Sequence, residues 1–317
     1  MLSPEISVVV PTYNRPDHLP RLLNALVQQT LPKDRFELVL VDDGSLSPVA
    51  PIAKKYATRI ALKYVRQPNA GPAAARNAGI AVATGMFVAF TDDDCAPDSD
   101  WLANFLHALA EFPDAMVGGA VRNGVEDALA SAAAQMVIDN VYRFYNRNPF
   151  QARFFASNNM ACSAELLRAL NGFDENFRCA EDRNLCDRWR LAGHRLVFTP
   201  EAKVAHFHRL DVASFARMHF AYGRGAVRFH SYRAVSGSES SRELLAFYGE
   251  WKRWMRRPFR DEPPGRAIRM FLYLLLWQAS NAAGVLYDIA AQSAGRSRPC
   301  RSAPSQAPAR RFFEDAV

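Results

Sequence analysis

The chain has 317 residues, 49% of them hydrophobic and 22% charged, and a formal net charge of +7. This length is enough for one large or two small domains with a sizeable core, which excludes a disulfide-dependent miniature fold. The cysteines show no CxxC spacing, so neither a disulfide framework nor thiolate metal binding is expected; they are Cys95, Cys162, Cys179, Cys186 and Cys300. The first residues lead into an apolar run without a signal-peptide pattern, which predicts a cytoplasmic location.

Strands and helices alternate along the first hundred residues. β-Rich runs at 6–10, 37–41 and 60–65 and an apolar run at 86–90 read as strands, and helical patterns follow residue 17 and fill about 72–82. Such alternation favours right-handed βαβ crossovers. The sequence therefore predicts an α/β fold with a doubly wound, mostly parallel sheet.

Acidic residues follow two of these predicted strands. Asp42 and Asp43 come after the run 37–41, and Asp92, Asp93 and Asp94 come after the run 86–90. In open parallel sheets ligands bind outside the carboxyl ends of the strands, so both groups should face one crevice. Adjacent carboxylates repel one another unless they hold a cation, and magnesium and manganese prefer such oxygens. The alternative is a pair of acidic turns that cap the following helices.

Six short segments occur in order between about Ile6 and His208. They are VVVPTYNR at 8–15, VDDGS at 41–45, ARNAG at 75–79, FTDDD at 90–94, NGFDE at 171–175 and AED at 180–182. Together, in this order and spacing, they resemble the family 2 glycosyltransferases. The resemblance implies a GT-A fold and an inverting enzyme that moves a sugar from a nucleotide-diphosphate sugar to an acceptor hydroxyl.

The resemblance also implies a divalent metal, Mn²⁺ or Mg²⁺, at the acidic triad. Asp92 and Asp94 match the DxD motif for metal and ribose, and Asp94 is the expected direct ligand. His206 matches a late histidine that completes the metal site in many enzymes of this fold, and His208 is its rival. Because carboxylates cannot bind phosphate directly, a metal would bridge them to the diphosphate and neutralise the departing charge.

Donor binding is expected from the same loops. Asp42 or Asp43 would accept hydrogen bonds from the base or ribose, Tyr13 would lie against the base, and Arg76 would face the diphosphate. A packed loop aromatic and a surface arginine are the alternatives for Tyr13 and Arg76. The full set of expected donor-binding residues is Pro11, Thr12, Tyr13, Arg15, Asp42, Asp43, Arg76, Asp92 and Asp93.

Two acids begin a helix that is predicted from Glu181 to about Gly193. A helix N-terminus favours negative charge, so a purely structural role is one explanation. By resemblance, one carboxylate of the pair deprotonates the acceptor hydroxyl, which attacks from the face opposite the leaving group. Asp182 is the preferred base and Glu181 the alternative.

The C-terminal third changes character. Leucines and aromatic residues recur at helical spacing in 244–255, with Lys252, Arg253, Arg256 and Arg257 at and beyond its C-terminal end, which suits an anionic membrane surface. The apolar stretch 270–286 would span roughly 26 Å as a helix, marginal for a bilayer. Because Gln278, Asn281 and Asp288 share one face, an interfacial or re-entrant helix is expected; a helix packed on the preceding domain is the alternative.

We therefore expect a catalytic domain over 1–210, divided into a nucleotide-sugar half (about 1–95) and an acceptor half (about 96–210). A helical extension that could associate with a membrane would follow over 211–293, and a disordered tail over 294–317. The expected partners are a nucleotide-diphosphate sugar, a sugar or lipid-linked acceptor and the cytoplasmic leaflet, but not nucleic acid, because no recognition motif accompanies the arginines of the tail.

Two other functions fit parts of the pattern. A nucleotide-sugar-binding module without turnover would keep the donor motifs, but would not need intact Asp94 and Asp182. A nucleotidyltransferase of similar fold would need a glycine-rich, basic loop after the first strand, and the segment 11–14 lacks glycine.

Overall fold

A mixed eight-stranded sheet forms the centre of the computed structural model, which describes residues 3–47, 49–238 and 241–294. The strand order is β3-β2-β1-β4-β7-β6-β8-β5. The strands are β1 (Ile6–Thr12), β2 (Phe36–Asp42), β3 (Leu62–Arg66), β4 (Phe87–Phe90), β5 (Cys95–Pro97), β6 (Met116–Asn123), β7 (Met160–Ser163) and β8 (Leu196–His206). The first four pair in parallel, whereas β7 is antiparallel to β4 and β6, and β5 to β8. The predicted α/β class is confirmed.

Helices cover both faces of the parallel half. Alternate residues of β1 enter different cores: Val8 and Val10 pack in one cluster with α1 (Leu19–Val27), and Val9 packs in the other with α3 (Pro72–Val82). This is the alternation that a strand buried on both faces requires. The short α2 (Ala50–Tyr56) completes the side that α1 covers.

The second half of the sheet brings distant segments to the same edge. Its helices are α4 (Trp101–Glu111), α5 (Leu129–Tyr145), α6 (Ala164–Ala169) and α7 (Glu181–Leu191), with a 3₁₀ turn at Pro149–Gln151. β8 is one strand of 11 residues, and it pairs with β5 so that His206 lies opposite Cys95. This pairing places the histidine beside the acidic triad that precedes β5.

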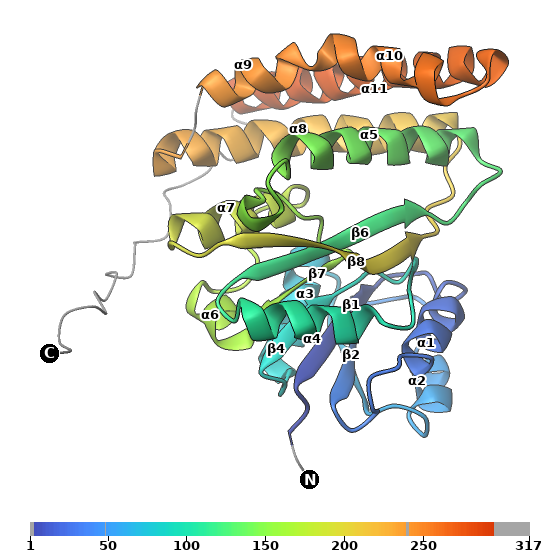
Figure 1. Ribbon diagram of the computed structural model, residues 1–317, viewed down its shortest axis with the longest axis vertical. Coiled ribbons are helices and arrows are strands. Elements are labelled where there is room, and N and C mark those ends of the chain that lie inside the picture. The colour runs from blue at the N-terminus through green and yellow to red at the C-terminus, as the bar shows by residue number, and fades with distance from the viewer. Residues whose placement is uncertain (1–2, 48, 239–240, 295–317) are drawn as a thin grey trace, which may run out of the picture.

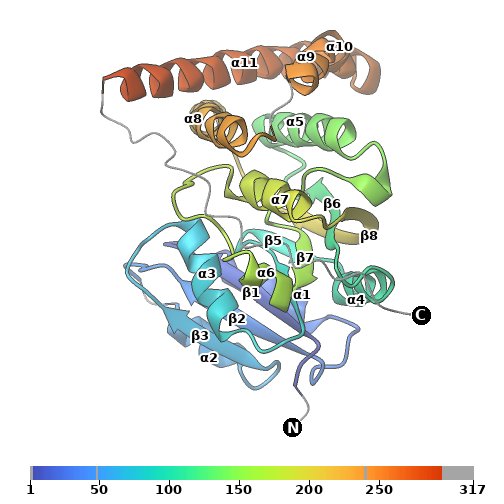
Figure 2. The same ribbon diagram turned by 90° about the vertical axis from the view of Figure 1, so that its left-hand side faces the viewer.

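Four further helices form a layer that we call the helical cap: α8 (Val212–Ser236), α9 (Ser241–Gly249), α10 (Trp251–Asp261) and α11 (Pro264–Ser293). Figures 1 and 2 show α8 beside α5 above the sheet, with α9, α10 and α11 as an outer layer. Close packing of α8 on α11 depends on two glycines. A Cβ at Gly223 would lie 2.1 Å from the carbonyl oxygen of Asn281, and one at Gly284 would lie 2.1 Å from that of Phe220.

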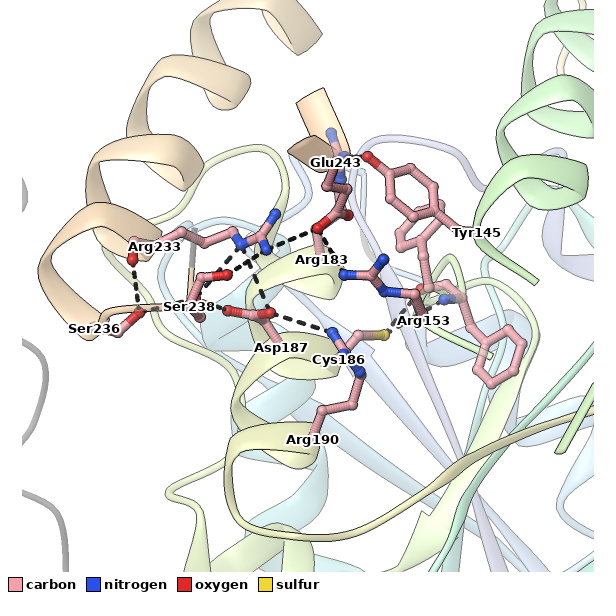
Figure 3. Close-up of polar contacts among 12 residues, drawn as sticks. Tyr145, Arg153, Arg183, Cys186, Asp187, Arg190, Arg233, Ser236, Ser238 and Glu243 are labelled. Carbon is pink, nitrogen blue, oxygen red and sulfur yellow. Dashed lines mark hydrogen bonds and ion pairs between the residues drawn. The ribbon is translucent and has the colours of Figure 1, made fainter. Parts of the chain in front are cut away.

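Ion pairs connect the cap to α7 and to the loop before β7 (Figure 3). Glu243 on α9 accepts hydrogen bonds from Arg153, at 2.6 Å, and from Arg233 on α8, at 3.0 Å. Asp187 on α7 accepts from the Ser238 hydroxyl at 2.7 Å. These side chains are largely buried, so the joint between α7, α8 and α9 is fixed by charge as well as by packing.

The α11 helix is longer than the expected apolar stretch 270–286. It runs for 30 residues and is, within the described part of the chain, the one helix long and apolar enough to cross a membrane by length and composition. Three of its polar residues point inward: Asp288 is 2% exposed and is paired with Arg224, and Gln278 and Asn281 line a cavity. The predicted tail beyond Ala294 lies outside the described residues.

Candidate active site

Asp94 is the centre of the acidic triad. Its Oδ1 lies 3.2 Å from Nε2 of His206, and its Oδ2 lies 3.0 Å from a guanidinium nitrogen of Arg15. Burial alone would raise the pKa of Asp94, but the hydrogen bond and charge of His206, together with Arg15, hold it well below the usual range. The same contact outweighs burial at His206 and raises its pKa. Asp94 is thus a persistent carboxylate.

The two neighbouring acids have partners of their own. Asp93 is 4% exposed and accepts a hydrogen bond from the Thr12 hydroxyl at 2.7 Å; burial raises its pKa to about 6 although Arg15 opposes the shift. Asp92 is partly exposed, and its Oδ1 lies 2.7 Å from Arg76. The triad therefore offers one carboxylate paired with Arg76 and two that share Arg15.

Among the described residues, two groups of side chains could hold a metal ion, and both contain Asp94. One joins it to Cys95 and His206, the other to His18 and Asp93, with ligand atoms within 4.8 Å of one another. Asp92, an expected ligand, is in neither group, since Arg76 holds its side chain.

His18 is a metal-ligand candidate that sequence reasoning missed, because nothing in its pattern separates it from an ordinary residue at a helix start. Its Nδ1 is buried without a partner among the described residues. Burial raises the pKa of Cys95 well above its normal value, so it favours the thiol. The remaining oxygen and nitrogen donors fit Mn²⁺ or Mg²⁺.

Arg76 connects the triad to the predicted base. It is 3% exposed, and its guanidinium contacts Asp92 at 2.7 Å and Glu181 at 3.0 Å. Burial and the adjacent charge of Asp182 raise the pKa of Glu181 to about 7, even though Arg76 favours its charged form. The arginine expected to face a diphosphate is here a bridge between two acids on different elements.

Asp182 lies beside this bridge and is not part of it. One of its oxygens accepts a hydrogen bond from the backbone N–H of Arg183 at 2.7 Å, and burial raises its pKa above the usual value.

The residue before the acids, Ala180, has a φ of 67°, in the left-handed region. Such a conformation costs about 1–3 kcal/mol in a residue other than glycine, and it sets the direction in which α7 begins.

Asp42 and Asp43 have protein partners already. The carboxylate of Asp43 accepts hydrogen bonds from the side chains of Gln67 and Asn69 and from two backbone N–H groups, those of residues 70 and 71. Asp42 accepts from the backbone of Ser45 and from the hydroxyl of Tyr64 at 2.7 Å. These bonds order the loop before α3, and contact of either acid with a nucleotide stays a prediction.

One cavity of about 490 Å³ joins five of the predicted site residues. Arg76, Asp92, Glu181, Asp182 and His206 all line it, and it continues to α5, α8 and α11. Of the other residues expected to bind donor, Tyr13 is 46% exposed after β1, and Pro11 and Thr12 end that strand. The structure thus brings the expected base and the edge of the expected metal site to one cavity.

Comparison with known proteins agrees with this geometry. The sequence profile described as glycosyl transferase family 2 matches residues 7–169. A pre-mycofactocin glycosyltransferase of Mycobacterium tuberculosis is 31% identical over 258 aligned residues, covering 79% of this chain and 52% of that protein. This chain thus spans about half the length of that relative. Glycosyltransferase AglE of Haloferax volcanii is 26% identical, with 71% and 74% covered.

Solved structures show the same fold. The mannosyltransferase PcManGT of Pyrobaculum calidifontis, in complex with GDP-Man and Mn²⁺, superposes with a TM-score of 0.68 and 21% identity, covering 91% of this chain and 88% of that one. TarS of Staphylococcus aureus, in complex with UDP-GlcNAc, gives 0.53 and 20%, with 92% of each chain covered. The family match extends from β1 to the end of α6, slightly more than half of the sequence, and the chain therefore belongs to glycosyl transferase family 2.

Proposed function

We propose that this protein transfers a sugar from a nucleotide-diphosphate sugar to an acceptor hydroxyl, with inversion at the anomeric carbon. The observation that carries the proposal is the single cavity whose wall contains Asp92, Arg76, Asp182 and His206. A donor held at the strand ends and an acceptor held beside α7 would meet there. The family membership and the GT-A neighbours support the same reaction class.

A divalent cation would be held by Asp94 and His206, with His18 and Asp93 as further donors. When bound, it supplies positive charge that neutralises the departing diphosphate. Arg15 reaches the same carboxylates, so it can stay beside the site as a second positive charge. The nucleotide is proposed to lie over the loop after β1, against Tyr13.

Asp182 is proposed as the general base. It would accept the proton of the acceptor hydroxyl, while the acceptor oxygen attacks from the side opposite the leaving group. Its raised pKa makes it a stronger base than an ordinary aspartate. Glu181 is the weaker candidate because Arg76 occupies one of its oxygens.

Binding of nucleoside diphosphate tests the metal part of this proposal. GDP and UDP are the probes, since structural neighbours were solved with guanosine and uridine sugars. In the wild-type protein one of them should raise the melting temperature more in the presence of Mn²⁺ than without it. Asp94→Asn should lose this manganese-dependent increment, and Asp127→Asn, at an exposed carboxylate on the surface, should keep it. An Asp94→Asn protein that responds like wild type would remove the metal assignment.

We also propose that the outer face of the cap contacts the anionic cytoplasmic leaflet. Three polar residues of α11 face inward, while an apolar stripe faces out: Ile268, Leu272, Leu275, Leu286 and Ile289 are each 41–67% exposed. Exposed basic residues lie on the adjoining α10: Lys252, Arg253, Arg256 and Arg260. Each basic residue near an anionic surface contributes about 1 kcal/mol, in addition to the apolar burial.

Flotation with phosphatidylserine-containing vesicles tests the membrane proposal. The full chain should float at low salt, and the double variant Leu272→Glu with Leu286→Glu should not. Leu191→Glu changes an equally exposed leucine on α7, away from the cap, and should float like wild type. If the double variant floats as well as wild type, the stripe is not a membrane surface.

A further inference from the structure

The cavity extends far beyond the predicted catalytic residues. Beyond Asp182 its walls come from α5, α8, α9, α10 and α11, and they include Trp277 and Asn281 on α11. The lining there is mainly apolar, and its rings include those of Tyr145, Phe154, Phe247, Trp254 and Trp277. A volume of about 490 Å³ lies within the range of small-molecule sites, which are typically lined by apolar walls with a few polar groups.

His219 on α8 is the most unusual polar group on this wall. It is 2% exposed, and neither ring nitrogen has a hydrogen-bond partner within the described residues. Burial, with a smaller effect of His208, lowers its pKa to about 4, so the imidazole is neutral near pH 7. A neutral imidazole has one donor and one acceptor, and leaving both buried without partners is unfavourable. Its place on the cavity wall makes a bound molecule a suitable partner.

His219 lies between the predicted catalytic residues and the part of the cavity lined by α11. On the catalytic side, His208 acts on it electrostatically, and the ring of His208 lies 5.2 Å from that of His206. On the other side, its ring centroid lies 6.3 Å from that of Trp277. A second cavity-lining polar atom, Oδ1 of Asn158, is also buried without a partner in the described part of the chain.

We propose that this cavity binds the acceptor, and that the acceptor is an amphiphile whose apolar body lies among these rings while one of its polar groups hydrogen-bonds to His219. The inference rests on the proposed transfer reaction. The acceptor hydroxyl points toward Asp182 and gives it the proton. The acceptor oxygen then bonds to the anomeric carbon as the bond from that carbon to the diphosphate oxygen breaks, and the electron pair leaves with the nucleoside diphosphate.

Tryptophan fluorescence can report on occupation, because Trp251, Trp254 and Trp277 line the cavity while the other two tryptophans, Trp101 and Trp189, do not. Decyl β-glucoside below its micelle concentration and methyl β-glucoside are the probes; they share the sugar and differ in the apolar body. Decyl glucoside should change the emission saturably, and methyl glucoside at equal concentration should not. Equal responses to both would contradict an apolar site.

A filling substitution locates the site. Ala134 on α5 lines the cavity, so Ala134→Phe should place a ring in it and weaken binding of decyl glucoside by at least about tenfold. Ala110→Phe, at an exposed alanine on α4, is the matched control and should bind like wild type. Unchanged binding by Ala134→Phe would place the probe elsewhere, for example on the outer face of α11, and overturn the proposal.

Substitution of His219 tests the proposed hydrogen bond between this residue and the acceptor. This test remains available if Ala134→Phe does not fold. His219→Phe should weaken decyl glucoside binding by about three- to tenfold, the value of one or two lost hydrogen bonds. The melting temperature of the free protein should be equal or higher, because the unpartnered nitrogens are gone, whereas a structural histidine would lower it. His219→Gln, which keeps a hydrogen-bond donor and an acceptor, should recover part of the affinity. Equal binding of decyl glucoside by wild type, His219→Phe and His219→Gln would refute the proposed hydrogen bond to His219.

The outcome for the donor site is read separately. Manganese-dependent stabilisation of the wild-type protein by GDP or UDP tests the transfer proposal and does not involve the cavity beyond Asp182. Donor binding without any response to decyl glucoside would therefore overturn the acceptor inference alone. A response to decyl glucoside without nucleotide binding would instead count against the transfer proposal.

Discussion

The two ends of the cavity are built on different principles. At the donor end, charged groups are fixed in pairs: Asp94 with His206, and Asp92 and Glu181 with Arg76. At the cap end, apolar rings surround His219, whose nitrogens lack protein partners in the described chain. Fixed charges stabilise a charged reaction without reorganising, whereas an apolar wall selects mainly by shape. With the proposed reaction and acceptor site, this difference predicts that reaction type and acceptor choice can be altered separately.

The largest effect is expected at Asp182, which lies between the two ends of the cavity. Asp182→Asn keeps the shape and removes the proton acceptor, so transfer should fall by about 10²–10⁴-fold while binding of GDP or UDP persists. Turnover with a transferable acceptor and nucleotide binding should be measured on the same preparation. If Glu181→Gln is the inactive variant and Asp182→Asn is active, the two roles are reversed.

Arg76 tests whether the paired charges of the donor end are interdependent. Arg76→Met leaves Glu181 buried without its positive partner and frees Asp92, which should destabilise the fold by about 3–5 kcal/mol. Chemical denaturation at pH 7 measures this. Arg122→Met removes a more exposed arginine, paired with Asp98, and should cost less than about 1 kcal/mol. Similar losses of unfolding free energy in both variants would show that the Arg76 bridge contributes no more to stability than an exposed ion pair.

The cap end is instead sensitive to shape. Gly284→Ala puts a methyl group against the carbonyl of Phe220, so α11 must move from α8, at a cost of about 1–3 kcal/mol and with weaker decyl glucoside binding. Gly265→Ala is the matched control, because nothing lies within 4 Å of its added Cβ. It should leave stability unchanged or raise it by up to about 1 kcal/mol. Equal thermal denaturation of the two variants would contradict close helix packing.

The pH dependence of the unfolding free energy should also distinguish the two ends of the cavity, through a smaller effect. The pKa of Glu181 is raised to about 7, so the native state keeps its proton between pH about 4.3 and 7 while the unfolded chain loses it. The native state binds more protons there, and the unfolding free energy should fall as pH rises through this window, by about 1–3 kcal/mol. Glu181→Gln should remove this fall. His219→Phe should instead make it steeper, because the lowered pKa of His219 makes its own contribution to stability rise with pH between about 4 and 6.5. Parallel slopes in wild type and Glu181→Gln would refute the raised pKa of Glu181.

Much of the donor end could be predicted from the sequence because its signals are local. Apolar runs of strand length followed by acids place Asp42, Asp43 and the triad at the same sheet edge, and the structure puts them there. The pair Glu181–Asp182 was recognised as the start of a helix, and α7 begins at Glu181. Residues adjacent in sequence keep their relation in a strand or helix whatever the rest of the chain does.

Only the tertiary structure determined which partners those residues have. The pairing of β5 with β8 brings His206 to Asp94, the bridge from Arg76 to Glu181 spans 105 residues, and His18 lies near the triad through the course of α1. The inward polar face of α11 was also not predictable, because an amphipathic pattern does not say which of its faces meets protein. Here Arg224 pairs with the inward Asp288. His219 was missed for the same reason: a lone histidine in a helix becomes distinctive only when packing removes its partners.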